Sequence, residues 1–430
     1  MMETTDYLVV GAGPAGSAAA VALRKEGMEC VVVDRARFPR VKLCGGLLTG
    51  KAQGVLRELL GEEKYGECME YCVASRERKF SLWESGVGET GGLCGEDVGT
   101  CEEDGAMCAE KGGERCGGKP RLLVEVEPRG EIVLIDRPRF DEWMVGLCRS
   151  LGAEVVEDDG VVDVDFDGRV ARLASGREIG YGNLIAADGA NGVVERLMAR
   201  RGGGCESAVR GACAQTKRRE AWDGKRGNSL CLEVNVDRED CPDAEGVQIH
   251  FGVVPRSYAW SFAKGDKVCL GLVKLDGVEM DVQGVFRRFL RCVGVRNVEK
   301  YPLRGAMIPF GNYMRCPAAE KEGVMYVGDA ARLVEPLTGE GIFYALQSGV
   351  YAARSGGDAG RYLRDVARLH RLIDKGGRYQ RWLMGSAFHG VMCRHAHKHP
   401  GFIEHFYSTQ IERACLDGFV KIVWKYKRGK

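Results

Sequence analysis

Three glycines near the start of the chain constrain its fold more than any other feature. They have the spacing G-x-G-x-x-G and lie between an apolar run at residues 7–10 and an Ala-rich stretch at residues 17–25. The three are Gly11, Gly13 and Gly16. A β-branched run at residues 30–33 completes a strand–helix–strand unit. Parallel strands joined by a crossover helix predict a doubly wound α/β sheet.

The same turn is a candidate site for a dinucleotide. The first glycine permits a tight turn, the second lets a pyrophosphate approach the backbone, and the third lets helix and strand pack closely. Pro14 and Ala15 open the predicted helix, whose free N–H groups and positive potential favour phosphate. Asp34 ends the second strand, where an acid accepts hydrogen bonds from a ribose, and Arg35 follows it.

Length and composition bound the class of protein. A chain of 430 residues exceeds the usual size of one domain, and a hydrophobic content of 45% allows a large core. The net charge of +1 gives no reason to expect a nucleic-acid partner. The 18 cysteines are spread along a chain with no secretory signal, which favours free thiols in the cytoplasm. No apolar run reaches the roughly 18 residues of a transmembrane helix.

The order of the expected elements divides one domain into three pieces. Residues 1–75, 120–205 and 300–355 are predicted to form the nucleotide-binding domain, and residues 206–299 an interleaved α+β substrate domain. The Gly- and Cys-rich stretch 76–119 is interpreted as an insertion or loop, and residues 356–430 as a helical C-terminal region. Within these pieces we expect strands at 122–126, 132–135, 154–156, 183–187 and 324–328, a helix at 140–151 and a hairpin of 161–167 with 170–173.

Two further motifs place acids and glycines at predicted strand ends. Asp188 and Gly189 follow the strand at 183–187, and Gly328 and Asp329 follow the one that begins at 324. A glycine-bracketed loop then opens a helix. Its candidate residues are Pro336, Gly339, Glu340, Gly341 and Ile342. A helix N-terminus at this point can stabilise negative charge on a bound cofactor.

In this order, the three motifs resemble the FAD-binding fold of the para-hydroxybenzoate hydroxylase and glutathione reductase type. The resemblance spans roughly residues 6 to 350. It implies a Rossmann-like domain that binds FAD, with the ADP half at the first motif and the ribityl–diphosphate region at the third. The helix that follows the third motif would face the pyrimidine edge of the flavin.

Three shorter segments resemble the geranylgeranyl reductase family, and its bacterial CbrA-like branch most of all. Residues 43–48 contain the cysteine–glycine–glycine element, and residues 136–141 match a family pattern at a helix start. Residues 255–265 match the signature Pro-x-x-Tyr-x-Trp-x-Phe-Pro, with Ala263 in place of the last proline. The matching site residues are Cys44, Gly45, Gly46, Arg137, Tyr258, Trp260 and Phe262.

This resemblance implies an FAD-dependent oxidoreductase that hydrogenates C=C bonds of an isoprenoid lipid or prenyl diphosphate. NADPH or a ferredoxin would supply the electrons, the latter as a transient protein partner. Cys44, Gly45 and Gly46 would lie near flavin and substrate, and three roles are open for Cys44: proton donor, substrate contact or buried thiol.

The aromatic residues of the signature suggest how the reaction is assisted. Tyr258 and Trp260 alternate with Ala259 on a predicted strand, so both face the same side. Together with Phe262 they are expected to contact the substrate. Aromatic faces stabilise a developing cation by about 0.5 to 2 kcal/mol.

Two alternatives are open at this stage. The same scaffold hosts flavin-dependent monooxygenases, namely aromatic hydroxylases and halogenases, and a non-catalytic flavin- or lipid-binding electron carrier is the other. No metal site is expected, because the cysteines at 94, 101, 108 and 116 lack paired zinc spacing and the histidines between 389 and 405 are interpreted as a solvated face. The basic, aromatic tail at 421–430 suggests peripheral membrane contact.

Overall fold

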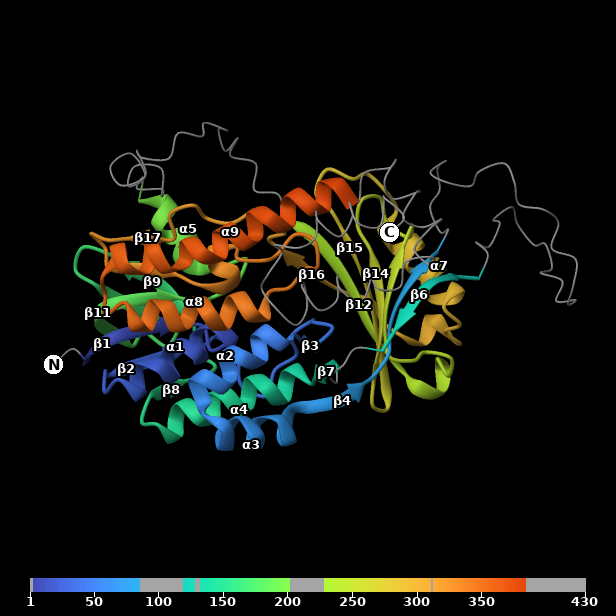
Figure 1. Cartoon of the computed structure of the whole chain (residues 1–430). Coiled ribbons are helices and arrows are strands. Elements are labelled where there is room, and N and C mark those ends of the chain that lie inside the picture. Colours follow the sequence, from blue (N-terminus) through green and yellow to red (C-terminus); the bar gives the residue numbers. More distant parts are fainter. Residues whose placement is uncertain (1–2, 86–118, 128–131, 202–227, 311, 384–430) are drawn as a thin grey trace, which may run out of the picture.

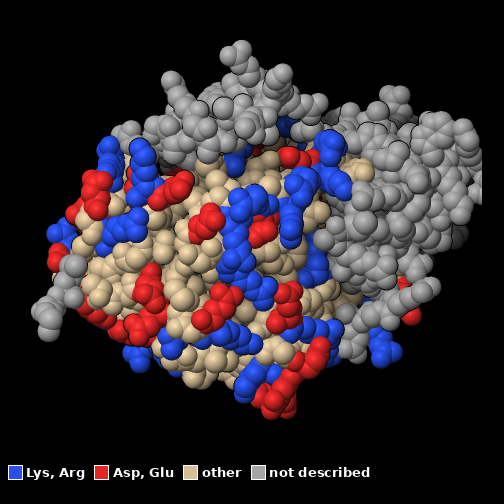
Figure 2. Space-filling view, turned by 60° about the vertical axis from the view of Figure 1, so that its left-hand side comes forward, with Lys and Arg blue, Asp and Glu red and all other residues tan. Residues whose placement is uncertain are grey.

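The computed structural model describes residues 3–85, 119–127, 132–201, 228–310 and 312–383 (Figure 1). Most of the Gly- and Cys-rich stretch, the histidines between 389 and 405 and the tail at 421–430 lie outside these ranges. Within the described residues, no helix is both long and apolar enough to cross a membrane. Lys and Arg side chains are interspersed with Asp and Glu over the face shown in Figure 2.

The first sheet is the doubly wound sheet that the glycine fingerprint predicts. Strands β1 and β2 pair in parallel on either side of the turn, and β11 lies parallel to β1 on the other edge. Strand β18 continues the parallel order beyond β11, and β8 beyond β2. The strands are β1 (Glu3–Val10), β2 (Cys30–Val33), β8 (Glu154–Val156), β9 (Val161–Asp165), β10 (Val170–Leu173), β11 (Glu178–Ala186), β17 (Ala318–Ala319) and β18 (Val324–Tyr326).

Helices cover this sheet, and α1 packs against two of them, α4 and α8. All residues of α1 from Ala15 to Leu23 are buried, because small alanines let other helices approach. A Cβ on Gly349 of α8 would lie 2.1 Å from the carbonyl oxygen of Ala15. The helices of this domain are α1 (Pro14–Lys25), α2 (Gly50–Leu60), α3 (Glu62–Cys72), α4 (Arg137–Ser150), α5 (Val193–Arg200), α8 (Ile342–Arg354), α9 (Ala359–Leu383) and the 3-10 turn η3 (Gly328–Ala331).

The second sheet has the order β16-β12-β15-β14-β13-β5-β6 and is antiparallel except at the β13–β5 pair. One of its faces packs on α7 through Phe286 and Phe289, and the other carries Tyr258, Trp260 and Phe262. Its elements are β5 (Phe80–Glu84), β6 (Arg121–Val126), β12 (Ser229–Asp237), β13 (Val247–Phe251), β14 (Ala259–Lys264), β15 (Lys267–Lys274), β16 (Arg304–Ile308), α7 (Val282–Cys292), η1 (Arg238–Asp240) and η2 (Val298–Lys300).

A small sheet joins the two domains. Strand β7 (Ile132–Ile135) pairs with β3 (Leu47–Leu48) and with β4 (Val73–Glu77), so the segment after Cys44 is tied to the chain that connects the two large sheets. Figure 1 shows β4 and β7 between the helices of the first domain and the strands of the second.

The predicted domain boundaries need correction at three strands. Strands β5, β6 and β16 pair within the second sheet, whereas the sequence boundaries assign them to the insertion or to the nucleotide-binding domain. The second sheet is assembled from pieces far apart in the chain, and short strand patterns do not reveal their partners. For the same reason β6 and β7 do not pair with each other but lie in different sheets.

The start of α4 also differs from the expectation. It begins at Arg137 rather than 140, because Asp136 accepts a hydrogen bond from the Arg139 N–H at 3.2 Å and Pro138 lies in the first turn.

Candidate active site

The glycine turn between β1 and α1 is shaped by close backbone contacts. Gly11 has a φ of +103°, and a Cβ there would lie 2.4 Å from the carbonyl oxygen of Ala187 at the end of β11. A Cβ on Gly16 would lie 1.8 Å from the carbonyl oxygen of Gly11. Backbone packing therefore requires a glycine at both positions.

The N-terminus of α1 lies next to a guanidinium group. Gly13 is the N-cap and has no side chain to cap the helix, and Pro14 occupies the first turn. A Cβ on Gly13 would lie 3.3 Å from Nη2 of Arg40, which is itself 3.3 Å from the Asp141 carboxylate. Free N–H groups and a cation at one point favour a diphosphate.

Asp34 holds the turn together from the end of β2. Its two carboxylate oxygens accept hydrogen bonds from the backbone N–H groups of Ala12 at 2.7 Å and Ala36 at 2.9 Å. Arg35 follows and contacts the backbone at Gly160, where a Cβ would be 2.7 Å from the Arg35 Cβ. The acid therefore fixes the two chain segments between which a ribose would be placed.

The second motif lies at the end of β11, facing the glycine turn. Gly189 has a φ of +80°, and Asp188 accepts a hydrogen bond from the Val194 N–H at 2.9 Å. Its other oxygen, Oδ1, is buried with no hydrogen-bond partner among the described residues. Burial raises the pKa of Asp188, and hydrogen bonds from the backbone of α5 oppose that shift.

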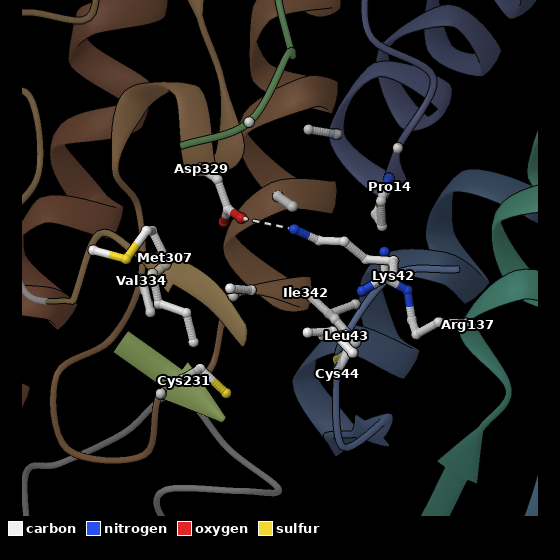
Figure 3. A pocket seen from close by; sticks show the side chains of 18 of the residues that line it. Pro14, Lys42, Leu43, Cys44, Arg137, Cys231, Met307, Asp329, Val334 and Ile342 are labelled. Carbon is white, nitrogen blue, oxygen red and sulfur yellow. Dashed lines mark ion pairs between the residues drawn. The ribbon is translucent and has the colours of Figure 1, made fainter. Parts of the chain in front are cut away.

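The third motif is tied to two other segments of the cavity wall. Asp329 lies 3.9 Å from the Lys42 ammonium, across the cavity shown in Figure 3. Glu340 accepts a hydrogen bond from the Thr49 hydroxyl and pairs with Lys51, both near the start of α2. Gly339 has a φ of +69°, and a Cβ on it would lie 2.7 Å from the hydroxyl oxygen of Tyr258.

The Cys44 segment fits closely against the second sheet. A Cβ on Gly45 would lie 2.6 Å from the Phe262 ring, and one on Gly46, whose φ is +80°, would lie 2.3 Å from the Ile135 carbonyl oxygen. The Cys44 thiol is half-buried and accepts a hydrogen bond from the Gly46 N–H at 3.4 Å. Larger side chains at either glycine would push the segment away from the aromatic residues.

Arg137 lies behind Cys44 at the start of α4. Its guanidinium makes two hydrogen bonds of 3.0 Å to the Asp141 carboxylate. Burial alone would lower the pKa of Arg137, but Asp141 and the nearby Cys44 outweigh it and raise that pKa. The buried cation is therefore permanently charged and gives the wall near Cys44 a positive potential.

The aromatic residues of the signature form one wall of the site. Ring centroids of Trp260 and Phe262 are 6.2 Å apart, and those of Tyr258 and Trp260 are 6.5 Å apart. The Tyr258 hydroxyl donates to the Thr338 carbonyl and so links the second sheet to the third motif. Burial raises the pKa of Tyr258, which keeps this hydroxyl neutral.

All these segments border one cavity of about 910 Å³. Nearly every site residue named from the sequence lines it. The lining members are Gly11, Gly13, Pro14, Ala15, Asp34, Arg35, Cys44, Gly45, Gly46, Arg137, Asp188, Gly189, Tyr258, Trp260, Phe262, Asp329, Gly339, Glu340, Gly341 and Ile342.

Three predicted residues do not line the cavity and support it instead. Gly16 packs on the glycine turn, as described above. A Cβ on Gly328 would lie 3.0 Å from the Ala15 Cβ, so this glycine keeps its loop close to α1. Pro336 packs on α9, 3.6 Å from where a Cβ of Gly377 would be.

Sequence reasoning missed several lining residues. Arg40 lies beside Gly13 and Lys42 beside Asp329, so both place positive charge where the cofactor would bind. Glu233 places a carboxyl group in the wall formed by the second sheet. The apolar part of this wall adds Phe80, Leu82, Cys231, Ile249, Phe251, Val273, Met307 and Ile308. Figure 3 shows Cys44 and Cys231 bordering the same cavity from the first domain and from β12. For Glu233, the one signal in the sequence is a charged residue within the largely apolar stretch 229–236.

Comparisons with known proteins agree with this architecture. Residues 9–42 match the model of an NAD(P)-binding Rossmann-like domain. The chain is 30% identical over 373 residues to menaquinone reductase of Mycolicibacterium smegmatis, covering 82% of this chain and 76% of that protein. It is 26% identical over 378 residues to digeranylgeranylglycerophospholipid reductase of Thermoplasma acidophilum, covering 82% and 78%.

Solved structures share the fold. A geranylgeranyl bacteriochlorophyll reductase-like protein of Thermoplasma acidophilum superposes with a TM-score of 0.62 at 18% identity, over 98% of this chain and 96% of that one. A halogenase in complex with FAD superposes with a TM-score of 0.59 at 12% identity, over 86% and 73%.

The residues of the cavity fit FAD. The glycine turn leaves the N-terminus of α1 open for a diphosphate, and Arg40 stands beside it. The cavity continues past Asp329 to the Cys44 segment, which leaves space for the remainder of the cofactor. With this site and these relatives, the chain belongs to the geranylgeranyl reductase family of FAD-dependent oxidoreductases.

Proposed function

We propose that this protein uses reduced FAD to hydrogenate C=C bonds of an isoprenoid chain. One observation carries the proposal: the cavity that begins at the glycine turn ends on the apolar inner face of the second sheet. Trp260, Phe262 and Leu82 lie on that face and are buried. Such a wall binds a hydrocarbon chain through the hydrophobic effect and excludes water from it.

The chemistry of an isolated double bond explains what the site must provide. Bound in its reduced form, FAD supplies a hydride. An alkene without an electron-withdrawing group accepts hydride only when a proton adds to its other carbon and positive charge develops. The faces of Tyr258 and Trp260 can stabilise such charge by about 0.5 to 2 kcal/mol each, more strongly where water is excluded.

The substrate is proposed to be an isoprenoid lipid or prenyl diphosphate, met at a membrane surface. The names of the two relatives support an isoprenoid-bearing substrate and differ in its head group. NADPH or a ferredoxin is proposed as the electron source, since the hydride used in each turnover must be replaced.

The experiment is a substrate comparison with the purified holoenzyme and a chemical reductant. Geranylgeranyl diphosphate, a digeranylgeranyl phospholipid and menaquinone are incubated separately, and products are analysed by mass spectrometry. The proposal expects one of them to gain two hydrogens per reduced bond of its isoprenoid chain, and the menaquinone sample is reoxidised to the quinone before analysis so that reduction of the ring is not counted. No mass gain with any of the three, but oxygen-dependent modification of an aromatic compound, would instead identify a monooxygenase.

A further inference from the structure

Glu233 occupies an unusual position in the wall of the cavity. It lies in the middle of β12, and only 2% of the residue is exposed. Cys231 and Glu233 line the cavity, while Leu232 and Val234 pack in the core under α7, as the alternation of a strand requires. A charged residue type has therefore been placed on the apolar face that would hold the substrate.

The carboxyl group is a neighbour of Trp260 across a glycine. In the second sheet Glu233 pairs with Gly271 of β15, and Gly271 pairs on its other side with Trp260 of β14. A Cβ on Gly271 would lie 2.2 Å from Cζ2 of the indole, so the ring covers the glycine. No side chain separates Glu233 from the indole in this row.

The carboxyl group lacks a full set of partners. Its Oε2 atom is buried and has no hydrogen-bond partner among the described residues. Burial raises the pKa of Glu233, and Lys264, hydrogen bonding from Cys44 and Cys269, and Arg137 oppose this shift without reversing it. Burying an unpaired carboxylate costs several kcal/mol, so such a group favours its protonated form.

A second cavity lies behind the same residue. It measures about 700 Å³, and Glu233, Cys44 and Arg137 border both cavities. The other charged groups around it are Lys42, Asp136, Arg139, Lys264, Asp266, Lys267 and Arg304, several of which are exposed to solvent. Glu233 therefore lies between an apolar cavity and a polar cavity whose lining includes solvent-exposed residues.

We propose that Glu233 is a neutral acid that gives its proton to the substrate double bond. The inference rests on the proposed function. With reduced FAD bound to supply hydride to one alkene carbon, Glu233 would give its proton to the other, so that the π bond would break and two C–H bonds would form. Glu233 is left as a carboxylate near Lys264 and Arg137, and water in the second cavity returns the proton.

Two other groups of the cavity wall carry a proton, and Tyr258 is the less suited of them. The Tyr258 hydroxyl already donates to the Thr338 carbonyl, and its burial raises its pKa. The Cys44 thiol borders both cavities like Glu233 and is the direct competitor. A test must therefore separate Glu233 from Cys44.

The experiment compares Glu233→Gln, Glu233→Asp and Cys44→Ala with the wild-type holoenzyme. Anaerobic single turnover with the isoprenoid should slow about 10²- to 10⁴-fold in Glu233→Gln, the usual effect of removing a general acid. Glu233→Asp should restore part of the rate. Glu245→Gln, an exposed residue just before β13 of the same sheet, is the control, and flavin absorbance and FAD affinity should stay unchanged in this variant and in both Glu233 variants.

Infrared spectroscopy gives a readout that does not depend on turnover. The wild-type protein should show the carbonyl stretch of a neutral carboxylic acid at pH 7, and Glu233→Gln should lose that band. An ionised Glu233 at pH 7 overturns the inference even if no isoprenoid is reduced. Full single-turnover rate in Glu233→Gln with wild-type reduction intact also overturns it, and leaves the proposed function standing.

Discussion

The indole of Trp260 covers Gly271, and a Cβ on that glycine would lie 2.2 Å from the ring. This contact places a large aromatic side chain against the inner face of the second sheet, where it forms part of the cavity wall. The absence of a side chain at Gly271 of β15 therefore shapes the site as much as the tryptophan on β14 does.

Gly271→Ala should displace the Trp260 ring and disturb the substrate chamber. Overpacking of this kind costs about 1–3 kcal/mol of folding stability. Turnover of the isoprenoid should fall while FAD affinity is kept, because the glycine turn is untouched. Thermal unfolding and single-turnover kinetics measure the two effects. Gly54→Ala in α2, where a Cβ meets nothing within 4 Å among the described residues, should instead stabilise by about 0.5–1 kcal/mol.

Gly16→Ala should produce a protein that retains little FAD. Its Cβ would lie 1.8 Å from the Gly11 carbonyl oxygen, so the turn has to open before the helix can form. The flavin-to-protein absorbance ratio after purification measures the outcome. Gly66→Ala in α3, whose Cβ meets nothing within 4 Å in the part of the chain that the structure describes, is the matched control and should purify with normal flavin content. Normal flavin content in Gly16→Ala would show that the turn is not the cofactor site.

Arg40→Ala should weaken FAD binding through the loss of a charge at the start of α1. A hydrogen bond to a charged group contributes about 1.5–3 kcal/mol, so the affinity should fall roughly tenfold to hundredfold. Titration of the apoprotein with FAD, followed by flavin fluorescence, gives the constant. Arg172→Ala removes an exposed cation paired with Asp163 and should not change FAD affinity. Equal affinities in the two variants would rule out a role for Arg40 at the diphosphate.

The stability of the protein should fall in mild acid. Burial lowers the pKa of His250 to about 3 and that of His370 to about 4, from an ordinary 6.5. Between pH 6.5 and these values the unfolded chain binds protons that the folded chain does not. The two histidines therefore leave the free energy of unfolding unchanged above pH 6.5 and lower it as the pH drops below that value. Each histidine contributes up to about 1.4 kcal/mol per pH unit.

Denaturant unfolding at pH 7 and pH 5 checks this pH dependence. His250 packs between Trp83 and Phe289, so His250→Phe keeps an aromatic ring in that space. The variant should lose less stability than the wild type over the same pH change. An identical loss in both proteins would contradict a neutral, buried His250.

The sequence predicts the first sheet well because its signals are local. Gly11, Gly13 and Gly16 lie within one turn, and Asp34 follows on the adjacent strand, so the fingerprint contains its own structural context. The second sheet is less predictable, since β5, β6 and β16 find their partners only in the folded chain. Arg40 and Glu233 could not be identified for the same reason: each becomes part of the site only through contacts with distant segments.

The most direct test of the account is anaerobic flavin reoxidation. The holoenzyme is reduced with dithionite, excess reductant is removed, and a geranylgeranylated lipid is added while flavin absorbance is followed. The account predicts that the oxidised flavin spectrum returns in step with a product heavier by two hydrogens per reduced bond. A flavin that stays reduced with the lipid, and is reoxidised only when oxygen and an aromatic compound are supplied, would contradict it.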